Sequence, residues 1–128
     1  MDIIYKMKTD KSFDKAVEDL KAKLAEHKFG VLWELNFKDK LQEKGFDFKT
    51  NFKVLEACNP AQAKKAFDAH LEAGFFLPCK LVVYEAPDSV MIGMLRPTEL
   101  IGLANFADLS GLASEVENEL KAAIDEAR

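Results

Sequence analysis

The chain has 128 residues, of which 48% are hydrophobic and 31% are charged, and its net charge is −4. This length can bury a core without disulfides or metals, so we expect one domain over residues 1–128. An acidic chain argues against a nucleic-acid-binding surface, which is usually basic. No apolar run reaches the ~20 residues that span a bilayer, and no basic-then-apolar segment marks a signal peptide. We expect a cytoplasmic protein with reduced thiols and neither a nucleic-acid nor a membrane partner.

Alternating or continuous apolar residues predict five strands. They lie at residues 3–8, 31–37, 52–58, 80–86 and 90–95. The turn residues Pro87, Asp88 and Ser89 predict that the last two strands form a hairpin. Gly93 inside the last strand indicates a bulge or a close backbone approach.

Apolar residues at three- and four-residue spacing predict the main helices. The first begins after Ser12, a favourable N-cap, and ends near His27. Ser110 is expected to cap the last helix, in which every fourth residue from Leu112 to Ile124 is apolar. Residues 39–44 suggest a short helix or turn, and the following loop is expected to insert Phe46 and Phe48 into the core. Strands and helices in this order indicate an α+β fold with helices against at least one sheet face.

The two cysteines lie at the two junctions of one predicted strand–helix–strand unit. Cys58 ends a strand, and Asn59 and Pro60 form a strong helix start, because Asn can cap an unpaired amide and Pro loses no hydrogen bond there. This helix is expected to run to residue 73 and to bury Ala63, Phe67 and Leu71. Cys79 then begins the next strand.

Each cysteine has a functional and a structural interpretation. A thiol at a helix N-terminus has a lowered pKa and a reactive thiolate, which makes Cys58 a candidate nucleophile and Cys79 a candidate resolving thiol. Both can equally be small buried residues that fill tight corners. The spacing permits contact between them without requiring it, so a disulfide stays open.

Acidic residues on three predicted strands are further candidates for a site at this strand–helix–strand junction. If the strands on either side of the helix align their faces, Glu56 and Glu85 cluster with the two cysteines. Glu34 is a third glutamate on an otherwise apolar strand. We therefore expect a pocket lined by Cys58, Asn59, Cys79, Glu34 and Glu85.

Metal and cofactor sites are not indicated. The 20 residues between the single cysteines match no compact zinc spacing, and His70 is expected about 15 Å up the helix from Cys58. The sequence has no glycine-rich phosphate loop, nucleophile elbow or HExxH motif. We expect no metal and no cofactor.

The run Ala57-Cys58-Asn59-Pro60, followed by Leu77-Pro78-Cys79 and Val82-Val83-Tyr84-Glu85, resembles the domain of unknown function 302 family. Glu34, after Phe29-Gly30-Val31, is similar to that family's early glutamate strand. The resemblance covers nearly the whole chain. It implies a curved, mainly antiparallel sheet with helices packed on it, similar to the TATA-binding-protein-like class, and a homodimer. It implies no activity, and the acidic chain argues against DNA binding by such a sheet.

Three functions remain open from the sequence. The first is a domain that binds or senses a small ligand in the predicted pocket. The second is a structural or partner-binding dimer in which the cysteines only pack. The third is a thiol-based redox enzyme or switch that uses Cys58 and Cys79.

Overall fold

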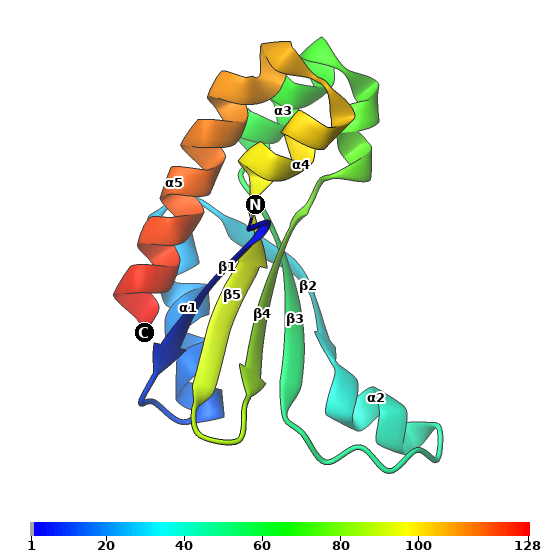
Figure 1. Cartoon of the computed structure of the whole chain (residues 1–128), viewed down its shortest axis with the longest axis vertical. Helices are drawn as coiled ribbons and strands as arrows, with labels where there is room; N and C mark the ends of the chain where they lie inside the picture. The colour runs from blue at the N-terminus through cyan, green and yellow to red at the C-terminus, as the bar shows by residue number, and fades with distance from the viewer. Residues whose placement is uncertain (1) are drawn as a thin grey trace.

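Five strands form one antiparallel sheet in the computed structural model, which describes residues 2–128 (Figure 1). The spatial order of the strands is β1-β5-β4-β3-β2. Their bounds are β1 Ile4–Thr9, β2 Gly30–Asn36, β3 Phe52–Cys58, β4 Cys79–Glu85 and β5 Val90–Leu95. The predicted strands are confirmed to within one residue at each end, and β4 and β5 form the expected hairpin.

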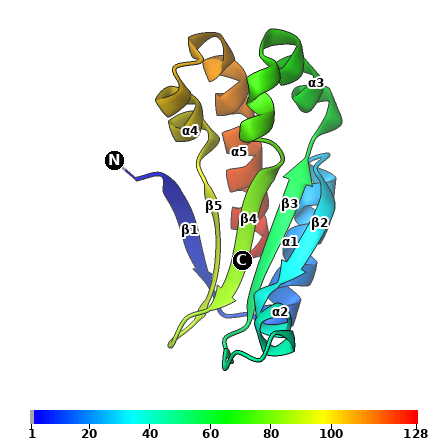
Figure 2. The ribbon, with the colours of Figure 1, turned by 90° about the vertical axis from the view of Figure 1, so that its right-hand side faces the viewer.

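Helices α1 and α5 cover one face of this sheet, and Figure 2 shows both behind the strands. On the other face, no helix formed by the described residues 2–128 covers the middle of the strands (Figure 2). The helices are α1 Phe13–Glu26, α2 Phe37–Glu43, α3 Pro60–Ala69, α4 Pro97–Ala104 and α5 Ser110–Ala127, with 3₁₀ helices η1 Leu71–Phe75 and η2 Ala107–Leu109. The α3–η1 segment and α4 lie with the start of α5 beyond one end of the sheet (Figure 1).

The core lies between the sheet and the two covering helices. Leu55 and Leu81 face each other across β3 and β4, and both are fully buried. Each covering helix contributes a fully buried leucine to this core, Leu20 from α1 and Leu120 from α5. The apolar residues that alternate on the strands and recur every four residues on the helices therefore face one another in the core, as expected.

The predicted caps at Ser12 and Asn59 are confirmed, whereas Ser110 is the first residue of α5 and makes no capping hydrogen bond. The Ser12 side chain accepts a hydrogen bond from the Lys15 amide at 3.2 Å. The Asn59 side chain accepts one from the Gln62 amide at 3.1 Å, and Pro60 occupies the first helical position. The Gly93 prediction is also confirmed as a close approach, since a Cβ there would lie 2.9 Å from the carbonyl oxygen of Tyr5.

Two details before β3 differ from the expectation. The register between β2 and β3 shifts between Val31 and Trp33, which indicates a bulge. The bulge puts Val31 and Trp33 on different faces, although strict alternation along the strand over residues 31–37 would place both on one face. Phe46 does not enter the core, since its side chain is 65% exposed. It lies just after α2 in the chain.

The helix after Asn59 is shorter than expected. It ends at Ala69, and the extended backbone of His70 separates it from η1. Because the helical phase is interrupted there, Leu71 leaves the predicted buried stripe and is 82% exposed. Phe67 is exposed as well, and Ala66 is the buried residue of α3.

The fold class is confirmed as α+β, with helices packed on an antiparallel sheet. The likeness to the TATA-binding protein and the single-domain boundary stay predictions.

Candidate functional site

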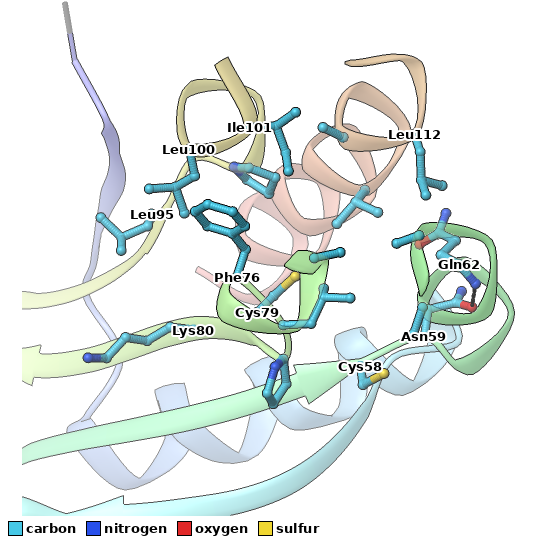
Figure 3. A pocket seen from close by; sticks show the side chains of 18 of the residues that line it. Cys58, Asn59, Gln62, Phe76, Cys79, Lys80, Leu95, Leu100, Ile101 and Leu112 are labelled. Carbon is cyan, nitrogen blue, oxygen red and sulfur yellow. Dashed lines mark hydrogen bonds between the residues drawn. The ribbon is translucent and has the colours of Figure 1, made fainter. Parts of the chain in front are cut away.

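A cavity of about 510 Å³ lies at the end of the sheet where β3 ends and β4 begins. One wall comes from α3 and η1, and the opposite wall comes from α4 and the first turns of α5 (Figure 3). The strand ends form the floor. Apolar side chains dominate the lining, among them Ala63, Ala66, Phe76, Leu77, Leu95, Leu100, Ile101, Leu112, Ala113 and Val116.

Small residues on α3 make room for this cavity. Ala63 and Ala66 are one turn apart on the same helix face and both line it. The opposite wall contributes the larger side chains of Leu100, Ile101 and Leu112 (Figure 3). Phe75 also lines the cavity yet is 85% exposed, which places it at the mouth.

The wall opposite α3 is held by a buried carboxylate. Glu117 on α5 accepts hydrogen bonds from the Thr98 hydroxyl at 2.7 Å and from the Thr98 amide at 3.1 Å. Arg96 donates to the same carboxylate at 3.2 Å through Nη2, and Lys121 lies 3.3 Å from it. Burial favours a raised pKa for Glu117, but these hydrogen bonds outweigh it and the pKa is lowered. Glu117 thereby ties the N-terminus of α4 to α5.

The structure brings three of the five predicted site residues to the cavity. Cys58, Asn59 and Cys79 all line it. The Asn59 side-chain oxygen is already used, because it caps α3 through the Gln62 amide (Figure 3). Asn59 therefore caps α3 and shapes this wall of the cavity.

Glu34 and Glu85 do not line the cavity, so the predicted five-residue pocket is wrong in these two members. Glu34 lies on the side of the sheet that faces α1, where its carboxylate is 2.6 Å from the Lys21 ammonium. Glu85 ends β4 at the other end of the sheet, about 20 Å along the strand from Cys79. There it accepts a hydrogen bond from Asn51.

The strand register also separates the thiols. Cys79 pairs with Ala57, so its side chain is on the face covered by helices, and Cys58 is on the other face. Of the expected cluster, Cys58, Glu56 and Cys79 all line the cavity, with Cys79 on the opposite face from the other two, and only Glu85 lies elsewhere. Both cysteines are free.

The pKa values of both thiols are raised, which lowers the fraction of reactive thiolate. Burial raises the pKa of Cys58, which contradicts the lowered pKa expected at a helix N-terminus. Cys58 belongs to β3 and precedes the N-cap Asn59, so it is not among the residues whose amides point along the axis of α3. Burial, with the nearby charges of Cys58 and Glu56, raises the pKa of Cys79 to about 12.

Two polar lining residues, Glu56 and Gln62, lie outside the predicted five, although Glu56 was expected near the cysteines. Glu56 pairs with Lys80 across β3 and β4, and burial raises the pKa of Glu56 although the charge of Lys80 opposes this. Gln62 lines the cavity from α3, and its side-chain oxygen is buried with no hydrogen-bond partner in the described part of the chain. Its position one turn before Ala66 on α3 was the available signal.

Residues 2–128 contain neither a cluster of metal-ligating side chains nor a helix that could span a membrane. No three His, Cys, Asp or Glu side chains in this range lie close enough together to hold a metal ion. Within the same range, each helix is too short or too polar to cross a membrane.

Comparison with known proteins decides the family. The family model described as Domain of unknown function DUF302 matches residues 5–127. The chain belongs to the DUF302 family. It is similar to the crystal structure of the uncharacterized conserved protein DUF302 from Bacillus stearothermophilus, with 39% identity, a TM-score of 0.96 and 100% of each chain covered. No curated protein matches the chain. The resemblance seen in the Cys-Asn-Pro and Leu-Pro-Cys segments is confirmed.

Proposed function

We propose that this DUF302 chain binds a small, mostly apolar ligand in the cavity between α3–η1 and α4–α5. The cavity itself carries the proposal. Its volume of about 510 Å³ and its apolar lining with a few polar groups are typical of small-molecule sites. Cys58, Asn59 and Cys79 belong to this proposed site, and Glu34 and Glu85 do not.

The thiol-enzyme alternative has less support. A thiol nucleophile needs a lowered pKa, whereas burial raises the pKa of both Cys58 and Cys79. The register that sends the two side chains to different faces also gives no support to a resolving pair. We therefore do not propose a redox reaction.

One observation favours the structural alternative for one cysteine. Cys79 packs against the main core cluster from the helix-covered side of β4. This contact supports a packing role for its thiol, beside its position at the cavity floor. A homodimer and a cytoplasmic location remain part of the proposal.

A titration with 1-aminoanthracene, whose fluorescence rises in apolar surroundings, tests ligand binding. We expect saturable binding at one site per chain. Ala63→Phe fills the cavity and is expected to abolish binding, because its new ring occupies the space beside α3. Ala69→Phe is the matched control, since Ala69 is exposed on the same helix and does not line the cavity. Equal binding by the two variants, or none by the unmodified chain, contradicts the proposal.

A further inference from the structure

The segment between β3 and β4, residues 59–78, forms an arm that is attached to the sheet along one edge. It leaves β3 after Cys58 and joins β4 at Cys79. These two attachment points are neighbours in the sheet, because Ala57 pairs with Cys79. Figure 2 shows α3 leading away from the sheet and the following segment returning to β4. The arm therefore has its hinge at the strand ends, and its free end lies near His70, where α3 gives way to η1.

Little apolar surface holds the arm against the rest of the molecule. Ala66 is the buried residue of α3, and Ala73 is the buried residue of η1. They join Leu109 of η2 in a small cluster that is separate from the main core. Burial of an alanine methyl group stabilises much less than burial of a leucine side chain, because the free energy follows the apolar area removed from water. Local opening of the arm is therefore expected to cost less than opening of the main core.

His70 joins the free end of the arm to the opposite wall of the cavity. Its ring stacks on the ring of Phe106, with the centroids 4.5 Å apart and the planes at 11°. Its Nε2 lies 2.8 Å from Oδ1 of Asp108, and since an ionised carboxylate only accepts, Nε2 donates this hydrogen bond. Phe76 of the arm adds an edge-on contact with Phe106 at 6.3 Å. Phe106 and Asp108 both belong to the connection between α4 and α5.

We propose that His70 latches the arm shut, and that opening of this latch admits the cavity ligand and releases it. This inference rests on the proposed function. The arm forms one wall of the cavity through Ala63 and Ala66, so a swing of the arm away from α4 and α5 widens the mouth. The opposite wall stays in place, because α5 packs in the main core and Glu117 ties α4 to it. Entry and exit share the opening step, so the latch sets the rate of exchange and leaves the affinity unchanged.

Stopped-flow fluorescence with 1-aminoanthracene measures both rate constants. Asp108→Ala removes the hydrogen-bond acceptor of the latch, and because Asp108 is exposed, the variant is expected to fold. We expect the association and dissociation rate constants both to rise about fivefold, with an unchanged dissociation constant. His70→Ala also removes the stack on Phe106, so we expect both rate constants to rise further.

Asp68→Ala is the matched control. Asp68 lies on α3, and its carboxylate pairs with Lys64 of the same helix at 2.7 Å. This variant makes the same change of charge as Asp108→Ala and is expected to keep both rate constants of the unmodified chain. If the probe binds and the two latch variants leave both rate constants unchanged, or change only dissociation, the cavity stands and the latch is overturned. If the probe does not bind the unmodified chain, the proposed function fails and the inference fails with it.

Discussion

Ala57 pairs with Cys79 across β3 and β4, one residue out of step with Cys58. This register directs the two thiols to opposite faces of the sheet although both reach the cavity at the strand ends. Burial then raises the pKa of each thiol.

The two thiols are therefore expected to react slowly at neutral pH. Alkylation of Cys58 by iodoacetamide should accelerate only at alkaline pH, and Cys79 should be labelled only after unfolding. Intact-mass counting of adducts in native and denatured protein measures both. Rapid native labelling below neutral pH, or an internal disulfide after mild peroxide, would restore the redox hypothesis.

Glu117 is expected to stabilise the fold through its bonds to Thr98 and Arg96. Its pKa is lowered in the folded state, so its contribution is present above the unfolded value near 4.5 and is lost as the pH falls through the folded pKa. Glu117→Gln should cost about 3 kcal/mol at neutral pH, since it leaves Arg96 without its buried partner. Urea unfolding measures this loss, with exposed Glu115→Gln as the control. Equal stabilities of the two variants would contradict the role of Glu117.

The contribution of His27 to the free energy of unfolding has the opposite pH dependence to that of Glu117. Its Nδ1 lies 2.5 Å from Glu119 and its Nε2 lies 3.1 Å from Glu126. The hydrogen bond to Glu119 raises the pKa of His27 above 6.5; burial opposes this, and the bond to Glu126 adds to it. The contribution is therefore complete below 6.5 and disappears as the pH rises through the folded pKa.

We expect His27→Gln to lose about 1 kcal/mol of unfolding free energy on the acidic side of this range and little on the alkaline side. Urea unfolding at a series of pH values gives the comparison. A loss that does not change with pH would show that His27 acts by packing alone.

Gly93 is expected to tolerate no side chain. A Cβ there would meet the Tyr5 carbonyl oxygen at 2.9 Å, so Gly93→Ala must push β1 away from β5. A loss of about 2 kcal/mol in thermal or urea unfolding is the expected result. At Gly111 on α5 a Cβ would meet nothing within 4 Å, and Gly111→Ala should be neutral or stabilising. A loss at Gly111 as large as that at Gly93 would argue against the close approach.

The homodimer implied by the family resemblance is tested by mass. Light scattering after size exclusion should give about twice the 14.4 kDa of one chain. A mass equal to one chain at all accessible concentrations would remove the dimer from the proposal.

Local patterns in the sequence predicted most of the fold. Side-chain alternation located the strands, and the caps at Ser12 and Asn59 located two helix starts, because these signals depend on neighbours a few residues away. The bulge after Val31 and the break of α3 at His70 were not predicted. Each depends on how a segment meets distant parts of the chain, and no local pattern of apolar residues records that.

The candidate site was only partly predictable for the same reason. Cys58, Asn59 and Cys79 were found because the strand–helix–strand unit places them at one end of the sheet. Glu85 was misplaced because a shared strand face does not place two residues close together, and Glu85 lies about 20 Å from Cys79 at the other end of β4. The opposite wall, with Leu112 and Ile101, comes from the last third of the chain, and its approach to α3 is a tertiary contact.

The position at which 1-aminoanthracene binds shows whether the cavity between α3 and α5 holds an apolar ligand. Nuclear Overhauser effects between the probe and methyl-labelled protein can locate it. We expect contacts with methyl groups of Ala66, Ile101 and Leu112, which line the cavity. Contacts confined to Ile4 and Leu32, which are exposed on the sheet, would contradict binding in the cavity.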